Sequence, residues 1–260
     1  MYFHKLKEIG PCMPSLSLRH ILRTLLVTFQ VPATQNIRYD IDTRRIMKRV
    51  LEKNSNCADI GAHEGEILDR MMKFAPEGKM TAFEPLPHMY EYLCRKYEGK
   101  NVRIFPVALY DRKGTTAFNY VVDDPAYSGI RKRRYDRENV TIKELTVETD
   151  LMDNLIPSGE PVRLMKIDVD GAEFAVLKGG AATIRRCRPY IIFECGLGAA
   201  DFYGTTPGDV FDFVKESCGL CLSTMRGFLT SKPVLSRQAF CDLFSSGKEY
   251  YFLAHPGPSA

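Results

Sequence analysis

The chain has 260 residues, of which 45% are hydrophobic and 26% are charged, and its formal net charge is +4. These proportions are typical of a folded domain of ordinary size, and they exclude a disordered or fibrous protein. A charge this small does not by itself predict nucleic-acid binding, because proteins of that class concentrate basic residues on one face.

The first 45 residues predict an N-terminal helical extension, which is followed by one main domain over residues 46–260. Within the extension, Leu16 to Val31 carries apolar residues at helical spacing, but charged residues interrupt it and it is too short to span a bilayer. We expect an amphipathic helix that packs on the domain or on a second copy of the chain, giving a homo-oligomer. Contact with a membrane surface is the alternative.

The eight cysteines are scattered, several of them in apolar segments, and the N-terminus shows no secretory signal. This usage favours a reducing compartment, so we expect a cytoplasmic protein. Cys218 and Cys221 have the spacing of a redox or metal pair, but they follow a predicted helix and lead into a strand, and no second pair is present. We therefore expect them to pack as ordinary side chains.

An apolar strand and a glycine turn form the first chemical motif of the chain. The segment Cys57–Ile60 runs into a Gly-x-x-x-Gly turn made by Gly61 and Gly65, and a second apolar segment, Met80–Phe83, ends on Glu84. This order predicts the first half of a nucleotide-binding Rossmann unit, in which the acid holds ribose hydroxyls. Because the spacing is not Gly-x-Gly-x-x-Gly, it favours a smaller adenosyl ligand, and S-adenosylmethionine is the candidate.

The remaining elements alternate between helix and strand. Helices are expected over residues 44–53, 66–74, 88–97 and 171–186 and from Thr206-Pro207, and strands over residues 57–60, 80–83, 102–107, 115–122, 140–149, 162–168, 189–194, 220–224, 227–230 and 250–254. This alternation predicts a mainly parallel sheet with helices on both faces. The last strands follow one another too closely for helical crossovers, so they should form an antiparallel edge.

Four motifs in register carry a family resemblance. They are Asp59–Gly65, Ala82–Pro87, Lys166–Glu173 with Val176–Gly179, and Pro189–Glu194, and together they cover about residues 55–255. With these motifs the chain resembles the FkbM family of S-adenosylmethionine-dependent methyltransferases. It departs from the family pattern at His63, where the family usually has Asn, and at Asp170, where the family usually has Glu.

The resemblance implies a class I methyltransferase fold, which is Rossmann-like and has a mainly parallel seven-stranded sheet, helices on both faces and an antiparallel C-terminal edge. It also implies O-methylation of a hydroxyl in a saccharide or in a glycosylated or polyketide-like metabolite. Two alternatives stay open: a non-catalytic binding or assembly protein with this fold, and a nucleic-acid methyltransferase. Against the latter, no Asn/Asp-Pro-Pro-Tyr/Phe signature follows the strand at residues 162–168.

Three residues are expected to hold the main parts of the cofactor. Gly61 permits the turn that brings backbone N–H groups to the methionine carboxylate, Asp59 faces the amino group, and Glu84 accepts hydrogen bonds from both ribose hydroxyls. The other cofactor-binding residues predicted are His63, Gly65, Pro85, Val107 and Ala108. Val107 and Ala108 close the strand at which this fold contacts adenine. S-adenosyl-L-homocysteine would be the product.

Acids at the carboxyl ends of the fourth and fifth strands of the predicted sheet are candidates for a general base, because open α/β sheets place their chemistry there. Asp168 is the first choice, with Lys166 as its partner, and Glu194 is the other catalytic candidate. The alternative is that Asp168 and Glu173 only organise the strand–helix turn. Clustered acids would also suit Mg²⁺, but nothing in their spacing demands a metal, and we predict no metal ligands.

The polar segment 123–139 is predicted to be a lid over the acceptor. Acceptor contacts are expected from Tyr127, Ser128, Asp170, Glu173 and Tyr203. The segment also carries a basic run, which either meets an anionic group or stays a solvated loop: Arg131, Lys132, Arg133, Arg134 and Arg137. The partner expected is a small-molecule or saccharide acceptor, without nucleic acid and without a transmembrane segment.

Overall fold

The computed structural model describes residues 18–135 and 140–257, and the chain divides into two compact units, residues 1–41 and 42–260. The first unit contains α1 (Leu18–Thr28) and the beginning of α2 (Gln35–Val50). The Thr34 side chain accepts a hydrogen bond from the Ile37 N–H and so caps α2. The helix predicted over residues 44–53 therefore begins earlier, at Gln35, and ends earlier, at Val50. The domain boundary predicted after residue 45 stays a prediction.

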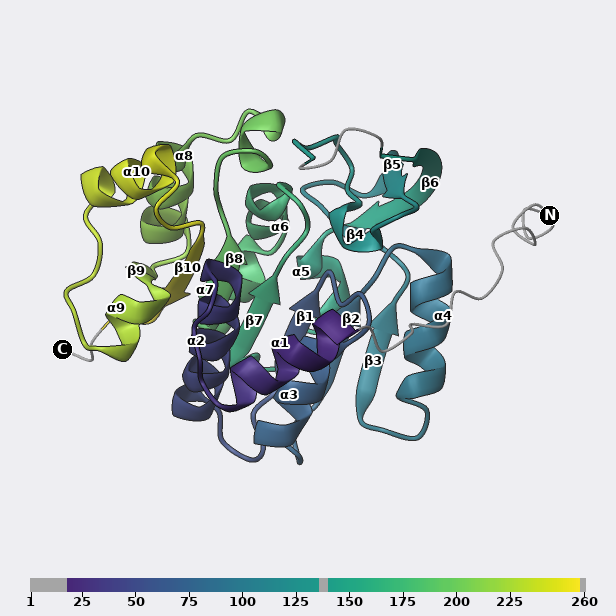
Figure 1. Cartoon of the computed structure of the whole chain (residues 1–260), viewed down its shortest axis with the longest axis horizontal. Coiled ribbons are helices and arrows are strands. Elements are labelled where there is room, and N and C mark those ends of the chain that lie inside the picture. Colours follow the sequence, from purple (N-terminus) through teal and green to yellow (C-terminus); the bar gives the residue numbers. More distant parts are fainter. Residues whose placement is uncertain (1–17, 136–139, 258–260) are drawn as a thin grey trace. The chain divides into compact units, whose positions relative to one another are not determined.

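The second unit is built on a seven-stranded sheet with the order β3-β2-β1-β7-β8-β10-β9 (Figure 1). Its strands are β1 (Cys57–Ile60), β2 (Met80–Phe83), β3 (Val102–Phe105), β7 (Leu164–Ile167), β8 (Tyr190–Glu194), β9 (Cys221–Thr224) and β10 (Tyr251–His255). β10 pairs antiparallel with both β8 and β9, and the other paired strands are parallel. The predicted seven-stranded, mainly parallel sheet with an antiparallel edge is confirmed.

Helices connect the strands of this sheet. They are α3 (Glu66–Phe74), α4 (Pro87–Lys96), α5 (Met152–Leu155), α6 (Glu173–Gly179), α7 (Ala181–Cys187), α8 (Pro207–Asp212), α9 (Met225–Leu229) and α10 (Arg237–Ser246), with short turns η1 (Pro125–Tyr127), η2 (Ala200–Tyr203) and η3 (Phe213–Ser217). Thr206 caps α8 as predicted, by accepting from the Asp209 N–H. None of the helices that the structure describes combines the length and the apolar character needed to cross a membrane.

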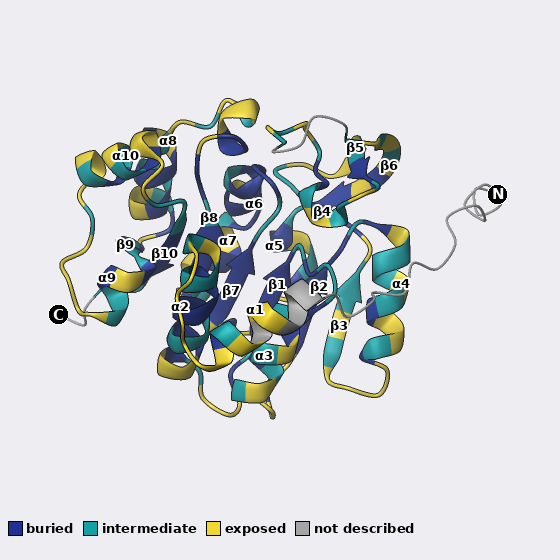
Figure 2. Ribbon diagram, in the orientation of Figure 1, coloured by how far each residue is buried: buried dark blue, intermediate teal, exposed yellow. Residues whose placement is uncertain are grey.

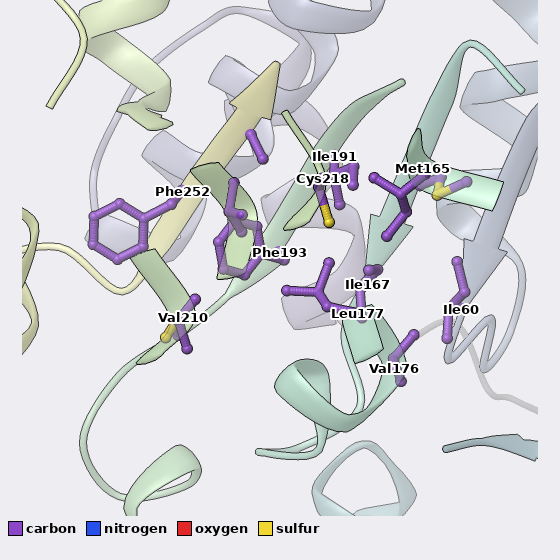
Figure 3. Packing of buried hydrophobic residues seen from close by; sticks show 14 of the residues in the cluster. Ile60, Met165, Ile167, Val176, Leu177, Ile191, Phe193, Val210, Cys218 and Phe252 are labelled. Atoms are coloured by element: carbon purple, nitrogen blue, oxygen red, sulfur yellow. The ribbon is translucent and has the colours of Figure 1, made fainter. Parts of the chain in front are cut away.

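The core lies between the sheet and the helices that cover it. Every residue of β1, β2 and β7 is buried, as the dark ribbon of these strands in Figure 2 shows. Ile60, Ile167 and Phe193 of the sheet belong to one cluster with Val176 and Leu177 of α6, which Figure 3 shows. This two-sided burial explains why these strands are mostly apolar and show no polar alternation; Asp59 in β1 and Lys166 in β7 are the charged exceptions.

A second, three-stranded sheet with the order β4-β6-β5 was not predicted. It consists of β4 (Ala108–Leu109), β5 (Gly114–Val121) and β6 (Ile142–Asp150). The strand predicted over residues 102–107 ends at Phe105, because Pro106 has no N–H to continue the ladder, and the chain then passes into the second sheet. This passage places Ala108 in a small core with Phe118 of β5.

Three further predictions differ from the structure. Residues 227–230 were predicted as a strand but fall largely in α9, which Thr224 caps by accepting from the Gly227 N–H at 2.9 Å. α10 was not predicted either. The segment between β9 and β10 therefore contains two helices, α9 and α10, although the last strands were expected to be too close together for helical connections. The helix predicted over residues 171–186 is two helices, α6 and α7, separated at Gly180.

Candidate functional site

The strand register brings the predicted site residues to one edge of the sheet. Ile60 pairs with Phe83 and with Ile167, and Ile167 pairs with Phe193. Gly61, Glu84 and Asp168 follow β1, β2 and β7, so they leave the sheet side by side. Glu194 lies next to them at the end of β8. This is the edge at which open α/β sheets bind ligands.

A pocket opens at this edge of the sheet. Its wall includes seven residues that the sequence predicted for the site: Gly61, His63, Glu84, Pro85, Val107, Ala108 and Asp168, and also the predicted acceptor residues Ser128 and Asp170. Its apolar wall includes residues that the prediction missed, namely Leu86, Leu109, Phe118, Ile130 and Val169. The other predicted site residues do not line the pocket: Asp59, Gly65, Tyr127, Lys166, Glu173, Glu194 and Tyr203.

Two glycines shape the turn after β1, and both have positive φ angles, 82° at Gly61 and 78° at Gly65. A Cβ atom at Gly61 would collide with the carbonyl oxygen of Asp168, so glycine is what lets this turn approach the end of β7. At Gly65 the collision would be with the Tyr97 hydroxyl. Gly65 thus has a packing reason to be glycine, and it does not line the pocket.

Glu84 connects the turns that follow β1 and β2. Its Oε2 accepts from the His63 N–H and its Oε1 from the Leu86 N–H, both at 2.9 Å. Burial raises the pKa of Glu84 to about 7, although both of these hydrogen bonds oppose the rise. A carboxylate has about four acceptor positions, so Glu84 can hold the backbone and still accept from a ligand in the pocket.

Two buried polar atoms near this turn have no hydrogen-bond partner among the residues that the structure describes: Asp59 Oδ2 and His63 Nε2. Asp59 lies within β1 and is 2% exposed. Burial raises its pKa to about 7; Lys166 opposes the rise, and the charges of Asp168 and Glu84 add to it. Buried polar groups are normally hydrogen-bonded, so this unpartnered carboxylate oxygen is an exception, and Asp59 itself does not line the pocket.

Asp168 follows β7, and 40% of its side chain is accessible. Its Oδ2 accepts from Lys166 Nζ at 2.7 Å, as predicted, and from Tyr251 Oη at 2.6 Å. Burial would raise the pKa of Asp168, but the charge of Lys166 and the hydrogen bonds outweigh it and hold the pKa below its ordinary value. Asp168 is therefore an ionised hydrogen-bond acceptor at the pocket wall.

The other acids of the cluster differ from Asp168. Burial, then the charges of Asp168 and Glu173, raise the pKa of Glu194 well above its ordinary value. Glu173 accepts from the N–H groups of Val169 and Gly171, at 3.0 and 3.2 Å, so its carboxylate organises the strand–helix turn. This is the structural role that the sequence left open for it.

The segment that follows β5 passes over the pocket and is anchored on both sides. Ser128 Oγ accepts from the Val121 N–H at 2.9 Å, the Arg131 N–H donates to Tyr203 Oη at 2.9 Å, and the Arg134 N–H donates to the Gly198 carbonyl at 3.0 Å. Residues 128–134 therefore join the second sheet to the loop after β8. Tyr127 and Tyr203 both support this segment, through the guanidinium groups of Arg133 and Arg131 respectively.

The basic run is partly neutralised within the protein. Arg133 forms an ion pair with Asp170, and burial raises the pKa of that acid even though Arg133 opposes the rise. Arg131 donates to the Phe202 carbonyl, whereas Lys132 and Arg134 are exposed. Arg137 lies outside the described residues. Within the described ranges, no group of three or more His, Cys, Asp or Glu side chains is arranged to hold a metal ion, so the Mg²⁺ alternative gains no support.

The comparisons with known proteins identify the family of the chain. The model of the methyltransferase FkbM domain matches residues 59–220. The chain is 28% identical over 162 residues to Methyltransferase sdnD of Sordaria araneosa and 26% identical over 159 residues to 2-O-methyltransferase NoeI of Sinorhizobium fredii. These matches take in 50% and 56% of this chain and 61% and 65% of the relatives, so the chain spans less than two thirds of either relative.

Among solved structures, the chain is similar to Methyltransferase FkbM from Methylobacillus flagellatus, with a TM-score of 0.48 and 12% identity over 91% of this chain and 59% of that one. It is also similar to a putative methyltransferase from Streptococcus mutans in complex with SAH, with a TM-score of 0.41 and 15% identity over 82% of this chain and 93% of that one.

Proposed function

The chain belongs to the FkbM methyltransferase family, and we propose that it is an S-adenosylmethionine-dependent methyltransferase of class I fold that methylates a hydroxyl of a saccharide or of a glycosylated or polyketide-like metabolite. One observation carries the proposal: the same pocket has a buried carboxylate, Glu84, at the end of β2 and an ionised one, Asp168, at the end of β7. The first suits ribose and the second suits a hydroxyl donor. The relative named 2-O-methyltransferase supports oxygen as the acceptor atom.

The pocket wall at β1 and β2 fits the cofactor. Glu84 has acceptor positions for the ribose hydroxyls, and Val107 and Ala108 offer an apolar surface for adenine. Asp59 does not line the pocket, but its unpartnered Oδ2 suits an ammonium donor. The φ angle of His63, 47°, turns the backbone at the same place. When bound, the cofactor supplies an electrophilic methyl group on a sulfonium centre.

On the acceptor side, Asp168 orients the reacting hydroxyl by accepting its hydrogen bond, and it takes the proton as the oxygen gains the methyl group. Lys166 stays beside it as a fixed positive charge, at 2.7 Å from Oδ2. The anchored segment 128–134 helps to exclude water from the pocket. The protein's contribution is thus alignment, proton acceptance and water exclusion.

The charges at this end of the pocket favour a neutral acceptor. Asp168, Asp170 and Glu194 gather here, and the two cations beside them are already paired, Lys166 with Asp168 and Arg133 with Asp170. A phosphate or carboxylate on the acceptor would have to compete for that arginine. Leu197 and Phe202, which are 50% and 44% exposed, lie in the loop that the segment 128–134 reaches, and they suit the apolar face of a sugar or aglycone.

Incubation of the purified protein with S-adenosylmethionine and a panel of free sugars, nucleotide-sugars and glycosylated metabolites tests the proposal. We expect a product that has gained one methyl ether, identified by mass spectrometry and nuclear magnetic resonance, with neutral acceptors preferred over anionic ones. Methylation of a nitrogen or a carbon atom, or of nucleic acid in place of any hydroxyl compound, would contradict it.

The two buried carboxylates of the cofactor site predict pH-dependent binding. Burial raises the pKa values of Asp59 and Glu84 to about 7, and both are proposed to bind in the ionised form. A bound proton must then leave each group before binding, so affinity should rise with pH up to about 7 and level off above it, by up to about tenfold per pH unit for each group. Calorimetric titration in buffers of different ionisation enthalpies measures the affinity and the protons released together.

Asp59→Asn is the matched variant for this pH dependence, because it keeps the side-chain volume and removes the titration. It should bind more weakly at about pH 8 and show a shallower pH profile. An affinity of the wild-type protein that stays constant from about pH 5 to 8, without proton release, would contradict the assignment of Asp59 and Glu84.

A further inference from the structure

Tyr251 reaches the site from a part of the chain that no site motif covers. It is the first residue of β10, beyond the residues 59–220 that the family model matches. Because β10 lies between β8 and β9, Tyr251 pairs directly with Glu194 across the antiparallel ladder. In this register the Tyr251 side chain lies at the end of β7, and its Oη donates a hydrogen bond to Asp168 Oδ2 at 2.6 Å. The two residues are 83 positions apart in the sequence.

Tyr251 and Lys166 act on the same oxygen atom. Lys166 Nζ lies 2.7 Å from Asp168 Oδ2 and 4.6 Å from the centre of the Tyr251 ring. The ring therefore covers the ammonium group while its hydroxyl binds the carboxylate. With two donors on one oxygen, the plane of the Asp168 carboxylate is fixed relative to the pocket that it lines.

The charges around Asp168 explain why these donors matter. The groups that act on it come from β1, β7, β8, β10, the turn after β7 and the first residue of α6, and they are Lys166, Tyr251, Glu194, Asp59, Asp170 and Glu173. Four of the six are acids. Glu194 also hydrogen-bonds to Asp168, which leaves at least one of the carboxylate's approximately four acceptor positions for an acceptor hydroxyl.

We propose that Tyr251 is a positioning residue for methyl transfer: its hydroxyl, together with Lys166, holds the Asp168 carboxylate ionised and oriented toward the acceptor hydroxyl. The inference rests on the role proposed above for Asp168. Burial and the neighbouring acids raise the pKa of Tyr251 well above its ordinary value, so its hydroxyl keeps the proton that it donates. Tyr251 itself takes no proton from the acceptor.

Tyr251→Phe tests this role because it keeps the ring over Lys166 and removes only the hydroxyl. We expect unchanged thermal unfolding and cofactor affinity, a fall in kcat of about tenfold, and an Asp168 pKa that rises by about one unit or more. Carbon nuclear magnetic resonance titration, with Asp168→Asn used to assign the signal, measures that pKa without any acceptor. Tyr190→Phe, at the opposite end of β8, is the control and should change none of these quantities.

Two variants separate the role of Tyr251 from the role of Asp168. If Tyr251→Phe leaves both the Asp168 pKa and kcat at their wild-type values while Asp168→Asn is inactive, then Tyr251 has no positioning role and the proposed function stands. A raised Asp168 pKa with wild-type kcat would also overturn the inference. Wild-type turnover by Asp168→Asn would instead overturn the role of Asp168 and, with it, that of Tyr251.

Discussion

Replacing Glu84 by glutamine is expected to weaken binding of S-adenosylmethionine by about a hundredfold or more at pH values where Glu84 is ionised. The carboxylate is proposed to accept hydrogen bonds from both ribose hydroxyls, and a hydrogen bond to a charged group contributes about 1.5–3 kcal/mol. Glutamine keeps one oxygen but loses the charge and one acceptor. Calorimetric titration with S-adenosylmethionine and with S-adenosylhomocysteine at about pH 8 measures the loss.

Glutamine is a better substitution than alanine because Glu84 also accepts from the N–H groups of His63 and Leu86. Alanine would leave both of these groups without their acceptor and would disturb the turns themselves. Glu91→Gln is the matched control, since Glu91 is an exposed acid of α4 that pairs with Arg95. It should bind the cofactor like the wild-type protein. Equal affinities for Glu84→Gln and the wild type would remove Glu84 from the cofactor site.

Replacing Asp168 by asparagine is expected to lower kcat by about 10²–10⁴ while changing cofactor affinity only a few-fold. Asparagine can still accept from Lys166 and Tyr251 through its amide oxygen, so the fold around the side chain should persist. It cannot take a proton from the acceptor hydroxyl. Steady-state kinetics with the acceptor found by screening, together with calorimetry, separates the two effects.

Asp242→Asn is the control for this experiment, because Asp242 is an exposed acid of α10 that hydrogen-bonds only locally, to Gln238. It should leave kcat unchanged. If Asp168→Asn turned over like the wild type, the proton acceptor would have to be another group, and Glu194, whose pKa is raised, would be the next to test.

The central sheet and the cofactor wall could be predicted from the sequence because their signals are local. The strands are short, mostly apolar runs, and Gly61, Glu84 and Asp168 each follow directly after one, so parallel pairing brings these three together. The strand order alone is enough to predict that these three residues lie close together. The pairing of Lys166 with Asp168 followed from two-residue spacing on one strand.

The parts that were missed depend on contacts that local patterns do not encode. The segment 227–230 is too short for its periodicity to distinguish a strand from a helix. It is helical because the Thr224 side chain caps the N-terminus of α9. The second sheet arises because Pro106 interrupts a strand and redirects the chain. Tyr251 has no motif of its own, and only the antiparallel pairing of β10 with β8 places it beside Asp168.

A crystal structure of the protein with S-adenosylhomocysteine is the most direct test of the proposed cofactor site and of its orientation toward Asp168. We expect both ribose hydroxyls within hydrogen-bonding distance of Glu84, the amino group facing Asp59, and the sulfur atom directed toward Asp168. Placement of the ligand in this pocket with its ribose away from Glu84, or binding elsewhere on the protein, would contradict the account.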